Sequence, residues 1–353
     1  METKDRGYFA PANAREWFEK RSYSHEEFKD VEKLARRKRE LGLTVSLVLP
    51  SRNVADTIGG IVERTNALNE EAPLGTPLVD QTLVVDADSG DGTAEVATAR
   101  GAEVYSENEL LSHYGGAHGK GDAMWRSLSV ARGDLVMFAD ADTKDFLPQF
   151  VYGTLGPVIS LPGVRFVKGA FRRPFKSQES LELDGGGRVT ELTTKPLFNL
   201  FYPELTGFVQ PLAGEFVADK ELFSSIPFLT GYAVETGVMI DVYKKVGLGA
   251  MAQVDLGTRQ NRHQALRDLG AMAYAVLATA TRRFYGDEAV DGARGAGALA
   301  VPSGSSTDLR EVSLEERPPL RTLPAKARGA GAGRGGPVGA TSASDRFSTS
   351  SSR

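Results

Sequence analysis

The stretch "DLVMFADAD", residues 134–142, decides how the rest of the chain is interpreted. Its apolar run predicts a buried strand, and the strand ends on Asp140-Ala141-Asp142. Two carboxylates one residue apart can chelate a divalent cation, because hard cations prefer oxygen ligands. We therefore expect Asp140 and Asp142 to bind a metal at the end of this strand, rather than to form a solvated turn.

Similar apolar runs precede this stretch and alternate with helical patterns. Continuous Val/Leu-rich runs separated by helices indicate an α/β protein whose mainly parallel sheet is covered on both faces. In such sheets ligands bind at the carboxyl ends of the strands. The strands expected upstream are "TVSLVLP" (44–50), "LVVD" (83–86) and "AEVYS" (102–106), with helices over 54–68, from about 93, and over 121–131.

The two ends of the chain differ from this α/β pattern. Ser24 and Glu27 form a capping-box pattern that predicts a helix ending near Gly42. After residue 297 the chain is rich in Gly, Ala, Ser and Pro, which predicts a disordered tail. We therefore divide the chain into an N-terminal helical extension (1–43), a first α/β half (44–160), a less regular second half (161–296) and the tail (297–353).

Composition excludes several classes of protein. The chain has 353 residues, 41% hydrophobic and 25% charged, with a net charge of −4, which argues against a dedicated nucleic-acid binder. It has no cysteine, so disulfides and thiolate chemistry are excluded. The polar N-terminus lacks the apolar core of a signal peptide, and no apolar run is long enough to span a bilayer. A cytoplasmic protein is expected.

Several other segments could carry chemistry. "DADSGDGT" (86–93) ends a strand like its downstream twin, but its turn and capping residues fit a nucleotide contact better than a metal. Lys120, in a glycine-rich loop before a helix, could meet phosphates. "GGGRVT" (185–190) suits an anionic group such as a phosphate or carboxylate, although by itself it fits an ordinary glycine loop with a surface arginine slightly better. His263 could complete a metal site, and Glu235 is either a buried cap or a sugar-hydroxyl ligand.

The chain resembles the glucosyl-3-phosphoglycerate and mannosyl-3-phosphoglycerate synthases, retaining glycosyltransferases of the GT-A fold in glycosyltransferase family 81. The resemblance covers roughly residues 44 to 285 and is most specific in GGGRVTEL and GKGDAMWRSL. The motifs that carry it occur in the family's order: SLVLPSRN, VVDADSGDGT, GKGDAMWRSL, FADAD, FRRPF, GGGRVTEL, QPLAGEF, GYAVETG and LGAMA.

The resemblance implies that residues 44–160 form the nucleotide-sugar-binding half and residues 161–296 the acceptor-binding half, and it implies a role for each matching residue. Lys120 would meet the diphosphate, with Arg259 beside it, and Leu212 and Glu235 would border the sugar. The acceptor 3-phosphoglycerate would be bound by Gly187, Arg188, Val189, Thr190 and Asn261. The donor nucleotide would be bound by Pro50, Ser51, Arg52, Asn53, Asp86 and Ala87, together with Lys120 and the Asp140-Ala141-Asp142 motif. The metal would be Mg²⁺, with Mn²⁺ or Co²⁺ as substitutes, bound by Asp142, Asp140 and His263.

The chain departs from the family pattern in places that affect the metal and the nucleotide. It has Asn261-Arg262-His263 where relatives have the order H-R-N, and we favour His263 as the ligand because imidazole binds metals better than an amide does. Val54 and Ala87 stand where relatives can have glutamate and serine. Both differences touch the donor base and ribose, so GDP-mannose and UDP-glucose, or GDP-glucose, all stay open as donors.

These expectations combine into one hypothesis with two alternatives. The chain would transfer mannose or glucose from a nucleotide diphosphate sugar to the 2-hydroxyl of 3-phosphoglycerate, retaining the anomeric configuration, and would form a homodimer as its family does. A sugar nucleotidylyltransferase would leave GGGRVTEL unexplained. A catalytically silent nucleotide-sugar-binding module is the second alternative, which an Asp142→Ala variant would separate from an enzyme.

Overall fold

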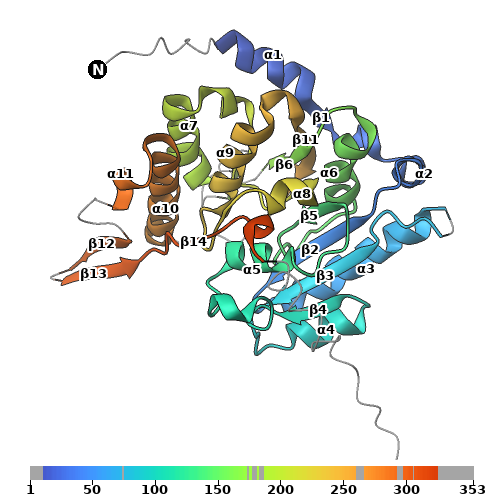
Figure 1. The fold of residues 1–353 in the computed structure, drawn as a ribbon, viewed down its shortest axis with the longest axis horizontal. Helices are drawn as coiled ribbons and strands as arrows, with labels where there is room; N and C mark the ends of the chain where they lie inside the picture. Colours follow the sequence, from blue (N-terminus) through green and yellow to red (C-terminus); the bar gives the residue numbers. More distant parts are fainter. Residues whose placement is uncertain are drawn as a thin grey trace, which may run out of the picture.

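An eight-stranded sheet lies at the centre of the part of the chain that this computed structural model describes (Figure 1). The described residues are 11–73, 75–172, 175–176, 181–182, 187–259, 266–291, 297–304 and 306–324. The strands stand in the order β1-β11-β6-β9-β5-β2-β3-β4. Their bounds are Ser22–Ser24 (β1), Val45–Ser51 (β2), Gln81–Asp86 (β3), Glu103–Ser106 (β4), Leu135–Phe138 (β5), Phe166–Arg172 (β6), Phe216–Asp219 (β9) and Met251–Thr258 (β11).

All neighbouring strands of this sheet are parallel except where β9 takes part. Strand β9 runs antiparallel to both β5 and β6, with Phe216 paired to Phe138 on one side and to Lys168 on the other. The amino end of β9 therefore lies at the same edge as the carboxyl ends of its neighbours. The mainly parallel sheet is confirmed, and the antiparallel strand in its middle was not predicted.

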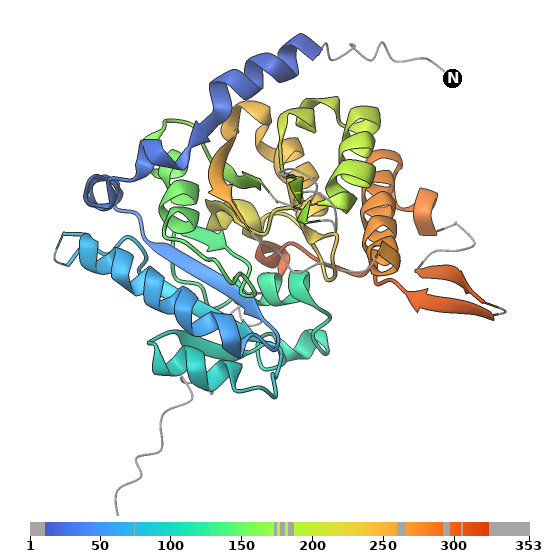
Figure 2. The same cartoon turned by 180° about the vertical axis from the view of Figure 1, so that it is seen from behind.

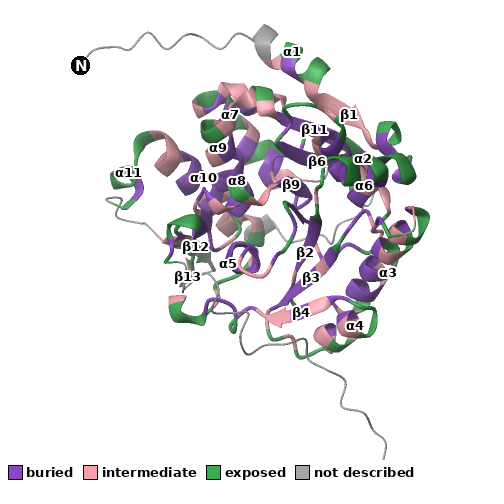
Figure 3. Cartoon of the chain, turned by 45° about the vertical axis from the view of Figure 1, so that its right-hand side comes forward, coloured by how far each residue is buried: buried purple, intermediate pink, exposed green. Residues whose placement is uncertain are grey.

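Helices cover both faces of the sheet, as the Val/Leu-rich strands require (Figures 1 and 3). Along β5, Val136 and Phe138 pack with α5 and α9, whereas Leu135 and Met137 pack with α3 and α6. None of the helices among the described residues is long and apolar enough to cross a bilayer. The helices are Pro11–Arg21 (α1), Val31–Glu40 (α2), Ala55–Glu71 (α3), Thr93–Ala99 (α4), Lys120–Ser127 (α5), Gln149–Ser160 (α6), Lys195–Phe201 (α7), Lys220–Ser224 (α8), Val234–Val246 (α9), Leu266–Tyr285 (α10) and Glu288–Asp291 (α11).

The N-terminal extension contains more than the predicted helix. The capping box at Ser24 is present, but it opens only a short 3₁₀ turn, and Asp30 then caps α2 by accepting a hydrogen bond from the Lys33 amide at 2.9 Å. The prediction of one continuous helix was wrong because a second cap interrupts it. Gly42 ends α2 with φ +66°, as predicted. Strand β1 joins the sheet by pairing with β11, so this extension is part of the central layer.

The predicted disordered tail begins too early. Residues 297–304 and 306–324 include a hairpin, β12 (Ala298–Ser303) with β13 (Ser306–Glu311), and a short strand β14 (Glu316–Arg317). Figure 2 shows the hairpin projecting beyond α10. Strand β14 pairs with β10 (Phe228–Leu229), and Arg317 is buried. The segment has little apolar periodicity, yet it buries Val312, Leu320 and Leu323 as well as Arg317. Residues 325–353 lie outside the described part.

Candidate active site

The loops after three parallel strands meet at one edge of the sheet. Ser51 at the end of β2 pairs with Asp86 at the end of β3, and β5 lies on the other side of β2. The amide of Ala87 donates to the Ser51 carbonyl at 2.9 Å. This edge therefore gathers the predicted donor loop after β2, the predicted nucleotide loop after β3 and the Asp140–Asp142 segment after β5.

The first two of these loops are hydrogen-bonded to each other. Both oxygens of Asp86 accept from Ser89, from its amide at 2.9 Å and from its hydroxyl at 2.7 Å. The Ser89 hydroxyl in turn accepts from the Asn53 amide at 2.8 Å, and Asn53 has φ +51°. Arg52, next to it, is exposed, whereas Pro50 and Ser51 still belong to β2. The two loops form one rigid rim, because side chains occupy the backbone donors that would otherwise need water.

Asp88, the second carboxylate of the upstream motif, is also engaged. It accepts from the Ser106 hydroxyl at 2.6 Å and from the Asn108 amide group at 2.8 Å. Hydrogen bonds from Ser106 and Asn108 lower the pKa of Asp88, so it is ionised at neutral pH. Asp86 thus stabilises its own loop, Asp88 connects that loop to the end of β4, and protein donors occupy the oxygens of both carboxylates.

Asp140 lies between two cations. The Lys120 ammonium donates to its Oδ1 at 2.5 Å, and the Arg259 guanidinium donates to its Oδ2 at 3.0 Å. Lys120 also donates to Glu235 at 2.7 Å. Burial opposes the charge of Asp140, but Lys120 and Arg259 outweigh it and depress the pKa of this carboxyl far below its usual range. Burial likewise opposes the charge of Lys120, and the carboxylates of Asp140 and Glu235 raise the pKa of Lys120.

Asp142 is the accessible carboxylate of the pair. Its side chain is 58% exposed, against 19% for Asp140, and it lies 3.6 Å from the Arg259 guanidinium. Ala141 between them is buried. Because the charge of Asp140 is already compensated by Lys120 and Arg259, Asp142 is the better placed of the two to bind a cation directly.

Two further ionisable residues, which the sequence interpretation had not assigned, lie behind this cluster. Glu215 is fully buried and accepts from Arg259 at 2.7 Å. Lys168, on β6, is 1% exposed and lies 4.3 Å from the centre of the Phe216 ring. Burial lowers the pKa of Lys168 to about 7. Glu215 belongs to the QPLAGEF motif, so a carboxylate just before an apolar strand was the signal that could have identified it.

The predicted acceptor loop approaches this cluster from the second half of the chain. Gly187 has φ +80°, and Val189 and Thr190 are buried at the start of the turn that leads into α7. A Cβ at Gly187 would lie 3.7 Å from the Gln210 side chain. Gln210 begins the segment that continues through the half-buried Leu212 to Gly214, and a Cβ at Gly214 would lie 2.0 Å from Asp140. The segment 210–214 therefore connects the predicted acceptor loop to the Asp140 cluster.

Of the predicted metal ligands, the structure describes only Asp140 and Asp142. Asn261 and His263 lie outside the described residues, so the choice between them stays a prediction. Among the described residues, no group of three or more His, Asp or Glu side chains is arranged to bind a metal. The donor set that remains is a hard one, an exposed carboxylate beside a charge-compensated carboxylate, and it fits Mg²⁺ or Mn²⁺.

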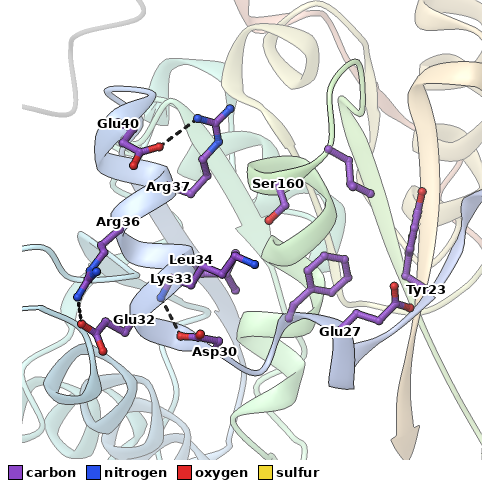
Figure 4. Close-up of a pocket in the computed structure, with 12 residues that line it drawn as sticks. Tyr23, Glu27, Asp30, Glu32, Lys33, Leu34, Arg36, Arg37, Glu40 and Ser160 are labelled. Atoms are coloured by element: carbon purple, nitrogen blue, oxygen red, sulfur yellow. Dashed lines mark hydrogen bonds and ion pairs between the residues drawn. The ribbon is translucent and has the colours of Figure 1, made fainter.

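A surface groove lined by the 3₁₀ turn His25–Phe28, α2 and the end of α6 shares no residue with this site (Figure 4). Its charged side chains are largely paired with one another. Arg36 contacts Glu32, and Arg37 contacts Glu40 at 3.1 Å. The groove therefore offers no concentration of unpaired charge, and the sheet edge is the better candidate.

Comparison with known proteins decides the family. A family model described as glycosyl transferase family 2 matches residues 46–159. The chain is 40% identical to the glucosyl-3-phosphoglycerate synthase of Mycolicibacterium smegmatis, over 80% of this chain and 90% of that protein. It is 65% identical to the crystal structure of mannosyl-3-phosphoglycerate synthase from Rubrobacter xylanophilus, with a TM-score of 0.78 over 87% of this chain and 98% of that one. The chain belongs to the glucosyl- and mannosyl-3-phosphoglycerate synthase family.

A relative in this family has a crystal structure with ligands bound. This is a glucosyl-3-phosphoglycerate synthase from Mycobacterium tuberculosis, in complex with Mn²⁺, UDP-glucose and phosphoglyceric acid. It is 37% identical, with a TM-score of 0.71 over 82% of this chain and 94% of that one. The predicted GT-A fold and the assignment as a glycosyltransferase are confirmed. The individual site residues stay proposals for this chain.

Proposed function

We propose that this glycosyltransferase moves a hexosyl group from a nucleotide diphosphate sugar to the 2-hydroxyl of 3-phosphoglycerate with retention of configuration. The observation that carries the proposal is the cluster in which Asp140 contacts both Lys120 and Arg259, beside the exposed Asp142. Such a cluster can compensate the charge that develops on a departing diphosphate. The ligands of the M. tuberculosis relative support the same substrate classes.

Each side chain of the cluster has a definite task in this proposal. Asp142 and Asp140 would bind a divalent cation, with His263 as the expected third ligand. When bound, that cation neutralises the diphosphate and makes it a better leaving group. Lys120 and Arg259 would contact the diphosphate oxygens. Glu235, which is 6% exposed and already bonded to Lys120, would accept from a sugar hydroxyl.

The nucleotide and acceptor would lie on opposite sides of this cluster. The rim around Asn53 and Asp86 would contact the base and ribose, and the loop from Gly187 to Thr190 would bind the phosphate and carboxylate of 3-phosphoglycerate. Arg188 is the cation of that loop and gives an anionic acceptor a charged partner. Leu212 would pack between the two sites, against the sugar.

The bond changes balance without a covalent enzyme intermediate. The bond between the anomeric carbon and the diphosphate oxygen breaks, and the acceptor 2-hydroxyl oxygen bonds to the same carbon on the same face. The hydroxyl proton passes to the departing diphosphate oxygen. The role of the protein is to orient the two substrates and to stabilise negative charge on the leaving group.

The test is turnover with defined substrates. The protein is incubated with GDP-mannose, GDP-glucose or UDP-glucose, 3-phosphoglycerate and Mg²⁺ or Mn²⁺, and the product is analysed by NMR. We expect an α-linked hexosyl-3-phosphoglycerate, and higher identity to the mannosyl enzyme makes GDP-mannose the first donor to assay. An inverted anomer, or no transfer from any donor, would refute the proposal. Pyrophosphate release from a sugar phosphate and NTP would indicate a nucleotidylyltransferase instead.

The Asp142→Ala variant serves as the control for turnover and for nucleotide binding. Asp142→Ala should abolish turnover while leaving the thermal unfolding temperature nearly unchanged, because its side chain is exposed. If the same variant and the wild type both bind nucleotide but neither turns over, the chain is a binding module.

Homodimer formation, which we also propose from the family, is measured by the molar mass in solution.

A further inference from the structure

The C-terminal segment Ser313–Leu320, here named the strap, lies against the helix that carries Lys120. Its strand β14 pairs with β10, and Arg317 is only 6% exposed. The Trp125 indole of α5 donates to the Pro318 carbonyl at 2.8 Å. A segment with little apolar periodicity is thus fixed at the back of the proposed donor site.

A buried charge cluster anchors the strap to α5. Asp122 is fully buried, and its two oxygens accept from Arg317 at 2.9 and 2.8 Å. Arg126, also fully buried, donates to Asp122 at 3.1 Å. Burial opposes the charge of Asp122, and the two guanidinium groups outweigh it and lower its pKa. A buried carboxylate requires such partners, so removing one of them is costly.

The Glu315 carboxylate also pairs with Arg317 at 3.0 Å, so two carboxylates match the two guanidinium groups, and carbonyl oxygens of one loop accept from the remaining donors. Arg317 donates to the carbonyls of Tyr114 at 2.9 Å and Gly116 at 3.2 Å. Arg126 donates to the Gly115 carbonyl at 2.7 Å and also to that of Leu110. The two arginines therefore determine the course of the glycine-rich loop that leads into Lys120.

This loop is in turn hydrogen-bonded, through Asn108, to the rim formed by the loops after β2 and β3. The amide of Ala117 donates to the Asn108 side chain at 2.9 Å, and Asn108 donates to Asp88 at 2.8 Å. The chain of hydrogen bonds from Arg317 thus ends on a residue of the proposed nucleotide loop.

The strap also supports α5 through β10. The Glu315 carbonyl accepts from the Thr230 amide at 3.0 Å, and the Thr230 carbonyl accepts from the Gly121 amide at 2.9 Å. Gly121 packs so closely that a Cβ there would lie 1.8 Å from the Leu229 carbonyl oxygen. Residue 121 follows Lys120 directly, so a shift of β10 would move the lysine.

We propose that the strap, anchored by Arg317, is a positioning element for the nucleotide diphosphate sugar: it fixes the loop at 114–116 and the start of α5, and so places Lys120 for the donor diphosphate. The inference rests on the proposed function for the nature of the donor. The contacts of Arg317 lead to α5 and to the loop at 114–116, both on the donor side of the proposed site. Arg317 should therefore govern donor affinity and leave acceptor affinity unchanged.

The test compares three variants of the full chain. Arg317→Gln removes the charge and the contacts to the loop, and Arg317→Lys keeps the charge but cannot make the same set of hydrogen bonds. The matched control is Arg310→Gln, because Arg310 lies in the same C-terminal region and pairs at 3.0 Å with Asp268 on the surface. The measurements are the Kd of UDP and of GDP with Mn²⁺ by calorimetry, without acceptor, and the KM values for the sugar donor and for the acceptor.

We expect Arg317→Gln to raise the nucleotide Kd and the donor KM at least tenfold, with the acceptor KM within twofold of wild type. Arg317→Lys should raise the donor values three- to fivefold, and Arg310→Gln should match the wild type. Unchanged donor values in folded Arg317→Gln, or equal increases for donor and acceptor, would overturn the inference. Should Arg317→Gln fail to fold, the same criteria are applied to Arg317→Lys.

The nucleotide measurement keeps this inference separate from the proposed function. If the wild type binds nucleotide but does not glycosylate 3-phosphoglycerate, the proposed acceptor is wrong, and the Arg317 series still decides whether the strap positions the donor site. If transfer occurs and Arg317→Gln binds nucleotide normally, the proposed function stands and the strap inference is wrong.

Discussion

Gly214 makes the role of Asp140 testable without changing a charged residue. The Cβ of an alanine at position 214 would lie 2.0 Å from Asp140 Oδ1 and 2.6 Å from its Oδ2. No carbon–oxygen contact survives at such distances, so the carboxylate must rotate away. The backbone at Gly214 does not have a positive φ, so alanine meets no conformational strain there. Gly214→Ala therefore acts mainly on the position of the carboxylate.

The size of the effect follows from the contacts that Asp140 would lose. A hydrogen bond to a charged group contributes about 1.5–3 kcal/mol. A rotated carboxylate cannot keep both the 2.5 Å contact to Lys120 and the 3.0 Å contact to Arg259. A loss of about 2–4 kcal/mol of transition-state stabilisation corresponds to roughly a 30- to 1,000-fold decrease in kcat/KM, at about 1.4 kcal/mol per tenfold.

The assay is kcat/KM for hexosyl transfer, with circular dichroism to verify folding. Gly249→Ala is the matched control, because a Cβ there meets nothing within 4 Å and its φ is not positive. Asp140→Asn should lose a comparable fraction of activity, and the double variant Gly214→Ala/Asp140→Asn should lose little more than either single one, since both act on the same carboxylate. If folded Gly214→Ala keeps kcat/KM within threefold of wild type, the contacts of Asp140 do not support the reaction and the reasoning is refuted.

Two further predictions concern the pH dependence of stability. Burial and the nearby Asp122 raise the pKa of Glu107 to about 7. The folded chain therefore binds more protons than the unfolded chain between pH 4.5 and 7, and it loses stability as the pH rises through this window. In urea unfolding, Glu107→Gln should be about 1–2 kcal/mol more stable than wild type at pH 8 and nearly equal to it at pH 4.5. Burial lowers the pKa of Lys168 to about 7, so the unfolded chain binds the extra proton between pH 7 and 10.5 and the cost of burying Lys168 falls as the pH rises. Lys168→Met should therefore gain stability over wild type, most below pH 7, and an advantage that does not shrink between pH 7 and 9.5 would contradict this.

The sequence predicted the parts of the fold that depend on local pattern. Strands β2, β3 and β5 are continuous apolar runs, and their ends could be assigned to one edge of a parallel sheet. The direction of β9 could not be predicted, because a four-residue apolar strand does not indicate which way it runs. Strand β1 at the far edge of the sheet was also not predicted, because a run of three residues shows no periodicity.

The candidate site shows the same division. Asp140, Asp142 and Lys120 could be selected because each follows a strand or precedes a helix in a recognisable motif. Their pairing partners could not, because Lys120 and Glu235 are 115 residues apart and Arg259 and Asp140 are 119 apart. Arg317 was assigned to a disordered tail, although it contacts Asp122 across 195 residues. Local composition contains no information about such long-range polar contacts.

The reversed direction of β9 has a consequence for how substrate preference can change in this family. Because β9 enters the sheet at the ligand edge, one short piece of chain, residues 210–215, contacts the proposed acceptor loop at one end and the Asp140 cluster at the other. A substitution there that reshapes the proposed acceptor side would also press on Asp140, which we place on the donor side in the proposed function. We therefore expect donor and acceptor preferences to be coupled through a few consecutive residues, so that variants selected for a new acceptor also show altered use of the nucleotide sugar.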